Sequence, residues 1–159
     1  MPIYIDIDGI KGSVTESSHK DQIEAESLHW GVSRAFTHIT GVATEKLGDK
    51  AQFSEVTFTK RIDKSSIKLF EACASGKHID KATIYIVGTQ EGDTQEFSSY
   101  ELADVLVSNF NESGNGGDLP HESVALNFTK FTFKFTSRDE KGKTTPATYG
   151  WDIKQNKKV

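Results

Sequence analysis

The chain has 159 residues, the length of one compact domain that buries about 68–70% of its unfolded surface. Hydrophobic residues make up 35% and charged residues 26%, which excludes a wholly disordered chain, and apolar runs such as 105–107 are far shorter than the roughly 18–20 residues that cross a bilayer. The net charge of −4 argues against a nucleic-acid duplex as partner, because duplex binding depends on basic side chains that neutralise phosphates.

The N-terminal segment carries no secretion signal that can be recognised from its composition. Residues 1–6 contain neither a basic region nor the start of a long apolar stretch, so we expect a chain that begins in the cytoplasm and is not exported through a cleaved signal. Cys73 is the single cysteine of the chain and cannot form an internal disulfide.

The first predicted element is a strand. Ile3, Ile5 and Ile7 alternate with polar or aromatic residues before the turn signal at Asp8 and Gly9, which is typical of a half-buried strand. β-Branched and aromatic residues with weaker alternation predict further strands near residues 22–36, 51–62, 82–87, 95–111 and 147–156.

Residues 37–50 show little periodicity and separate two of these strands. Hairpin loops usually have 2–5 residues, so a connection of this length in a compact domain is either disordered or used for contact. It includes three apolar residues, Ile39, Val42 and Leu47, which a purely solvated loop does not need. We therefore predict that these three residues make contacts with another subunit.

A short helix is predicted over residues 64–75. Asp63 is a suitable N-cap, Ile62 and Ile67 can form a hydrophobic staple, and Gly76 is placed to end the helix in the left-handed conformation. Ile67, Phe70 and Ala74 lie on one helical stripe. We expect this stripe to pack against the sheets, which gives Asp63, Ile67 and Phe70 a structural role.

The last third of the chain alternates clearly. Apolar residues occupy even positions over 124–128 and odd positions at Phe131, Phe133 and Phe135, so the pleat must slip once, and we predict a β-bulge near Thr129 and Lys130. Seven or eight strands with one helix predict a mainly β fold: an antiparallel β-barrel of two curled sheets with one short flanking α-helix, as a single domain over 1–159.

The sequence offers no convincing chemistry. Glu24 and Glu26 share a strand face but are explained as solvated charges, Cys73 falls on the apolar side of the helix, and Lys77 follows a glycine without the rest of a phosphate-binding loop. The histidines are scattered and lack metal-ligand spacing: His19, His29, His38, His78 and His121. We expect no catalytic, cofactor or metal site.

Several segments taken together resemble a known family. They are Gly9–Ser13, Trp30–Gly31, the F-T-K-R-I-D-K-S run of 58–65, 75–78, 124–128 and the Y-G-W-D-I-K-Q-N run of 149–156. In this order they are similar to the haemolysin-coregulated protein (Hcp) family of bacterial type VI secretion, and the resemblance extends over nearly the whole chain.

The resemblance implies a structural protein without an active site or cofactor. Members of the family are β-barrels that assemble into six-membered rings, and the rings stack into a tube like that of contractile phage tails. The tube lies inside a contractile sheath beneath a spike protein of the valine-glycine repeat family. It is propelled out of the cell without a signal peptide, and its lumen carries small effector proteins.

The sequence departs from the family pattern at two places. Ile67 stands where many members have proline, and the segment 37–50 has only Gly41 and Gly48 where many members are glycine-rich. A competing interpretation is a small monomeric β-barrel that binds a ligand such as a carbohydrate. That interpretation predicts a monomer with an exposed aromatic platform, whereas a tube subunit predicts a ring.

Overall fold

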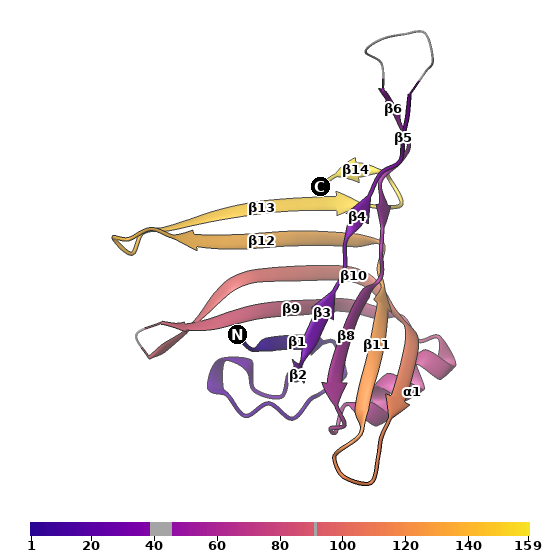
Figure 1. Cartoon of the computed structure of the whole chain (residues 1–159), viewed down its shortest axis with the longest axis vertical. Coiled ribbons are helices and arrows are strands. Elements are labelled where there is room, and N and C mark those ends of the chain that lie inside the picture. The colour runs from indigo at the N-terminus through magenta and orange to yellow at the C-terminus, as the bar shows by residue number, and fades with distance from the viewer. Residues whose placement is uncertain (39–45, 91) are drawn as a thin grey trace.

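Two curled antiparallel sheets share one long strand, β10 (Asp93–Ser113), and enclose the core between them (Figure 1). The computed structural model describes residues 1–38, 46–90 and 92–159. The first sheet contains, in spatial order, β2 (Ile23–Ala25), β1 (Ile3–Ile7), β9 (Ile79–Gln90), β10, β12 (Lys130–Arg138), β13 (Thr144–Asp152) and β14 (Lys157–Lys158). The predicted mainly β fold of curled antiparallel sheets is confirmed.

The second sheet crosses the first and is smaller. Its spatial order is β10, β11 (His121–Asn127), β8 (Val56–Arg61) and β3 (Ser27–His29). Between β2 and β3, the Glu26 N–H donates to Thr59 O at 2.7 Å. This bond joins the β2 edge of the first sheet to β8 of the second.

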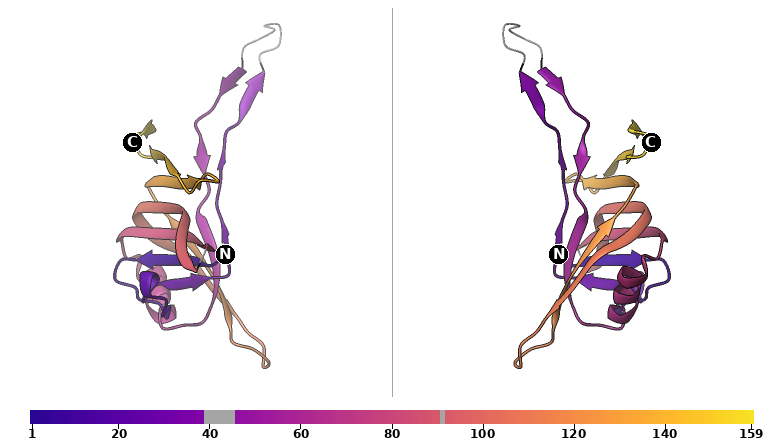
Figure 2. Two further views of the ribbon diagram at one scale, coloured as in Figure 1. Left: turned by 90° about the vertical axis from the view of Figure 1, so that its left-hand side faces the viewer. Right: turned by 90° about the vertical axis from the view of Figure 1, so that its right-hand side faces the viewer.

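A narrow two-stranded stem continues upward from β3 and β8, away from the core (Figure 1). It consists of the pair β4 (Val32–Ser33) with β7 (Gln52–Phe53) and the pair β5 (Phe36–His38) with β6 (Lys46–Gly48). The side views show it projecting well beyond both sheets (Figure 2). The predicted long loop 37–50 is therefore partly strand, because residues at both of its ends pair with each other across the stem.

Strand β10 changes partners in its middle. Residues 98–103 pair with β12 and residues 106–113 pair with β11, and Asp104 between them has a positive φ of 53°. The β-bulge predicted near Thr129 and Lys130 is wrong, because β11 ends at Asn127 and a separate strand begins at Lys130. The pleat changes there because the chain passes from one sheet to the other opposite the bend in β10.

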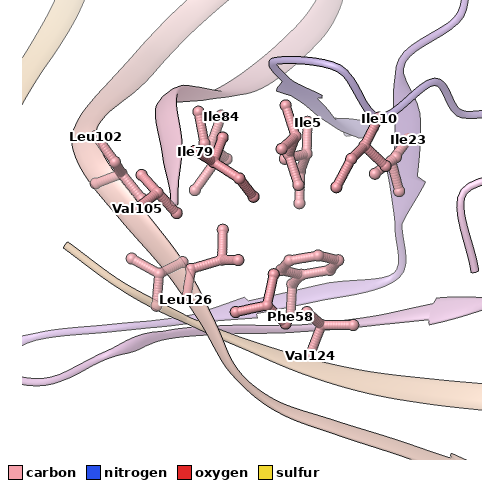
Figure 3. Close-up of a cluster of buried hydrophobic side chains, with 14 of the residues drawn as sticks. Ile5, Ile10, Ile23, Phe58, Ile79, Ile84, Leu102, Val105, Val124 and Leu126 are labelled. Carbon is pink, nitrogen blue, oxygen red and sulfur yellow. The ribbon is translucent and has the colours of Figure 1, made fainter. Parts of the chain in front are cut away.

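The core lies where the two sheets face each other (Figure 3). Ile5 and Ile84 of the first sheet and Phe58 of the second are fully buried, and burying each such side chain stabilises the fold by about 1.5–3 kcal/mol. Along β12 the exposed fraction rises from 5% at Phe131 through 36% at Phe133 to 45% at Phe135. The predicted strand is confirmed, but alternating burial ends at Phe131, because the outer half of β12 extends beyond the second sheet and leaves Phe133 and Phe135 exposed.

The single helix of the described residues, α1 (Ser66–Ser75), packs on the core through a different face from the predicted one. Leu69 and Ala72 are buried, whereas Ile67 is 79% exposed and Phe70 is 61% exposed. The predicted core placement of Ile67 and Phe70 is wrong. The apolar residues of α1 are spread around most of its circumference, so hydrophobic periodicity alone does not identify its buried side.

The predicted end of the helix at Gly76 is confirmed, whereas the predicted N-cap at Asp63 is wrong, because the N-cap is Ser65. Asp63 Oδ1 accepts the Ser65 N–H at 2.8 Å and thereby caps the turn that precedes the helix, although regular helix begins only at Ser66. At the other end Gly76 adopts a left-handed φ of 66°, and the Lys77 N–H donates to Ala72 O. The ten residues of α1 thus form most of the connection between β8 and β9.

A short 3₁₀ turn, η1 (Ser17–His19), precedes β2. His19 is buried there and stacks on Tyr4, and its Nδ1–H donates to Gln22 Oε1 at 2.9 Å. This histidine therefore fills the space beside β1 as a packed aromatic group.

Candidate assembly surface

A concave aromatic surface forms where the stem meets the first sheet. One cross-strand row runs from Tyr100 on β10 through Phe133 on β12 to Tyr149 on β13. The rings of Tyr100 and Phe133 stack with 4.7 Å between their centroids. The hollow has a volume of about 560 Å³. We call it the aromatic groove; its aromatic lining consists of Trp30, Phe53, Tyr100, Phe131, Phe133, Tyr149 and Trp151.

The base of the stem closes one side of the aromatic groove. The Trp30 ring meets Tyr100 and Phe131 edge-on at 5.1 and 5.2 Å, and the Phe53 ring lies 5.1 Å from that of Phe131. Trp30 precedes β4 and Phe53 ends β7, so both strands of the stem are fixed to the first sheet through the same aromatic cluster. Motion of the lower stem is thereby restricted.

Above this cluster, two apolar side chains of the described part of the stem are exposed. Val32 is 62% exposed and Phe36 is 59% exposed. A two-stranded ribbon is only marginally stable by itself, so the stem is a surface suited to contact. Of the residues predicted to make contacts, Ile39 and Val42 lie outside the described residues, and Leu47 pairs with Thr37 through its backbone in β6.

A second apolar surface lies on the outer side of α1. We call it the helix face, and it consists of Ile67, Phe70 and the Phe110 ring against which Phe70 packs edge-on at 5.6 Å. The structure thus places two of the predicted structural residues on the surface and brings neither of them to the aromatic groove. Figure 1 shows α1 at the lower end of the second sheet, and β12 and β13 in the upper part of the first.

A buried ion pair fixes the start of α1 to the second sheet. Lys60 Nζ lies 2.6 Å from Glu122 Oε2 and 2.9 Å from Asp63 Oδ1. Ser66 Oγ donates to the same Glu122 oxygen at 2.9 Å. These contacts join β8, β11 and the first turn of α1, and they orient Leu69 toward the core. Asp63 therefore acts through charge as well as through capping.

Two polar clusters occupy the surface. Hydrogen bonds from Arg61 and then from His121 lower the pKa of the Glu26 carboxyl below its usual value. At the bend of β10, His78 and Lys154 lower the pKa of the Asp104 carboxyl. Both clusters have ordinary ion-pair geometry.

Within residues 1–38, 46–90 and 92–159 no three histidine, cysteine, aspartate or glutamate side chains are grouped to hold a metal ion. Cys73 is partly buried on α1. The surfaces that distinguish this molecule are consequently the stem, the aromatic groove and the helix face.

Comparison with known proteins shows the family of this chain. The family model "Type VI secretion system effector, Hcp" matches residues 4–135. The chain belongs to the Hcp family of type VI secretion proteins. Protein hcp1 of Pseudomonas aeruginosa is 32% identical over 159 residues, which cover 98% of this chain and 97% of that protein.

Solved Hcp structures share the whole architecture. A type six secretion system protein superposes with a TM-score of 0.91 at 31% identity, covering 99% of both chains. Hcp1 from Salmonella typhimurium superposes with a TM-score of 0.79 at 30% identity, covering 99% of this chain and 98% of that one. The family resemblance expected from the sequence motifs is confirmed, and this Hcp is a type VI secretion protein.

The described part of the chain contains no helix that is both long and apolar enough to span a membrane.

Sequence reasoning missed the aromatic groove: it predicted the strands that carry Phe133 and Tyr149, but not that part of their inner face lacks a covering sheet. The sequence signal for the groove was that the aromatic residues of β12 and of β13 all occupy odd-numbered positions, which places those of each strand on one face of the sheet.

Proposed function

We propose that this protein is a structural subunit of the inner tube of a type VI secretion system. Identical chains form six-membered rings, the rings stack, and contraction of a surrounding sheath propels the tube out of the cell. The observation that carries this proposal is the stem, which projects beyond both sheets and exposes Val32 and Phe36. Such a ribbon gains stability when it packs against another copy.

Membership of the Hcp family supports the other proposed partners. The tube ends beneath a spike protein of the valine-glycine repeat family, and its lumen carries small effector proteins. In this proposal the chain is cytoplasmic before firing and extracellular afterwards, and it needs no cofactor. Its role is mechanical and not enzymatic.

Solution mass and electron microscopy test the proposal. Light scattering should give the mass of six chains, and negative-stain images should show closed rings, with stacks at higher concentration. A single-chain mass across the micromolar range would overturn it. Deletion of the coding gene should also abolish type VI secretion, and reintroduction of the gene should restore it.

The aromatic groove favours a second candidate function. Exposed rings such as Phe133 and Tyr149 provide a platform of the kind on which a ligand, for instance a carbohydrate, stacks. A monomeric ligand-binding module would bind oligosaccharides saturably in calorimetry and would show no ring. A ring without such binding would remove this candidate.

A further inference from the structure

Assembly into a closed ring sets a geometric requirement. Contacts between identical subunits that close by rotation are head-to-tail, so each copy must carry two different surfaces that fit each other. The inference below rests on the proposed ring and asks which two surfaces meet. The described residues provide a concave apolar surface and a convex one.

The concave surface is the aromatic groove. Its rim is accessible, because Phe133 and Tyr149 are 36% and 45% exposed. The chain's own second sheet covers the other end of the first sheet and leaves this part free. Cations lie at its border: Arg34 lines it, and Lys158 Nζ lies 5.7 Å from the centre of the Tyr149 ring.

The convex surface is the helix face. Ile67 and Phe70 are exposed and, with the Phe110 ring on which Phe70 packs, form a contiguous apolar patch of the kind that marks interaction sites. Glu71 follows Ile67 by four residues and therefore lies on the same side of α1. The helix face thus combines two apolar side chains with a carboxylate.

We propose that the helix face of one copy packs into the aromatic groove of the next copy around the ring. Ile67 and Phe70 then cover the exposed rings of Phe133 and Tyr149. Glu71 approaches the cations at the border of the groove, which gives the contact complementary charge. This assignment explains why α1 is apolar on both sides: one side packs on its own core through Leu69, and the other serves the neighbour.

Two single substitutions and their mixture test the pairing. Phe70→Glu places a charge on the helix face and leaves the groove intact, whereas Tyr149→Glu does the reverse. Both sites are more than two-fifths exposed, so a carboxylate at either can reach water. Leu119→Glu is the matched control, because Leu119 is 56% exposed in the β10–β11 connection outside both surfaces.

Native mass spectrometry distinguishes the outcomes. Each variant alone should be monomeric, and the control should assemble like the parent. An equimolar mixture of the two variants should give a dimer and no larger species, because only one intact helix face and one intact groove remain to pair. Rings formed by either variant alone, or a mixture that stays monomeric, would overturn the pairing but leave the tube function standing. A parent that is monomeric would overturn both.

Cross-linking keeps the test independent of effects on folding. In a Cys73→Ser background, Phe70→Cys together with Tyr149→Cys should form disulfides between copies when oxidised with glutathione disulfide. Denaturing gels should then show a ladder up to six chains, and either cysteine alone should give at most a dimer. An assembled ring that yields no ladder would contradict the proposed contact.

Discussion

Lys60 and Glu122 face each other across β8 and β11, and their 2.6 Å ion pair is entirely buried. A buried charge is expensive to leave alone, since its removal from water is no longer offset by the partner. Glu122 Oε1 has no hydrogen-bond partner among the described residues. The stability of this buried carboxylate therefore depends on the contacts of its other oxygen, Oε2, with Lys60 and Ser66.

Lys60→Met should therefore destabilise the protein by about 3–5 kcal/mol, because it leaves Glu122 and Asp63 without their shared cation. Denaturant unfolding followed by circular dichroism measures the effect. The double variant with Glu122→Leu is the control, and it should recover most of the loss by replacing the pair with apolar groups. A single variant within 1 kcal/mol of the parent would contradict the importance of this pair.

Two glycines should respond differently to alanine. At Gly12 a Cβ would lie 2.1 Å from Gln22 O, a backbone atom that cannot move aside, whereas at Gly76 a Cβ meets nothing within 4 Å but the φ of 66° is unfavourable. Gly76→Ala should cost about 1–2 kcal/mol through backbone strain alone. Gly12→Ala should cost clearly more. Thermal melts of the two variants compare them, and the reverse order would show that the segment at Gly12 can relax.

The stem should serve assembly and not the stability of the two sheets. Replacing Ile39, Val42 and Leu47 together by serine should leave circular dichroism and the melting temperature nearly unchanged while weakening ring formation or stacking. Sedimentation velocity at several concentrations measures the assembly. If the triple variant forms rings and tubes as readily as the parent, contacts between copies must lie elsewhere.

Acid should weaken the bend of β10 through Asp104. Its pKa is lowered by His78 and Lys154, so the folded state favours the charged carboxylate. The resulting stability is present above the unfolded-state pKa, near 3.9, and is lost as the pH falls through the lower folded-state pKa. Asp104→Asn keeps a residue that tolerates positive φ and removes the titration.

Urea midpoints measured from pH 6 to pH 2 test this expectation. The midpoint of the parent should fall more steeply than that of Asp104→Asn once the pH is below 4. Asp8→Asn is a useful comparison, because it removes an exposed carboxylate from the Asp8–Gly9 turn and not from the bend. Parallel curves for the parent and Asp104→Asn would show that Asp104 does not contribute to acid sensitivity.

Strand periodicity could be predicted from the sequence because its cause is local. Ile5, Ile7 and Phe131 are buried, as alternation required, since successive side chains of a strand point to opposite faces. The left-handed end of the helix at Gly76 follows from local backbone chemistry in the same way. Each of these features depends on neighbours in the sequence.

The side of α1 that is buried could not be predicted in this way. The choice depends on Ser66 and Lys60 meeting Glu122, and Lys60 and Glu122 are 62 positions apart. The aromatic groove depends likewise on how far the second sheet extends over the first. Contacts distant in sequence decide both, and periodicity contains no information about them.

The sharing of β10 by both sheets has a consequence for the order of folding during synthesis. Strand β9 pairs with β1 and β10, and β8 pairs with β3 and β11. A nascent chain that has reached residue 92 therefore holds strands from both sheets, yet lacks the strand that joins them. Such long-range pairing delays folding and leaves strand edges open in the meantime. We expect the two sheets to join in one late cooperative step that requires β10 and β11, so that chains interrupted before residue 127 are targets for chaperones or proteases.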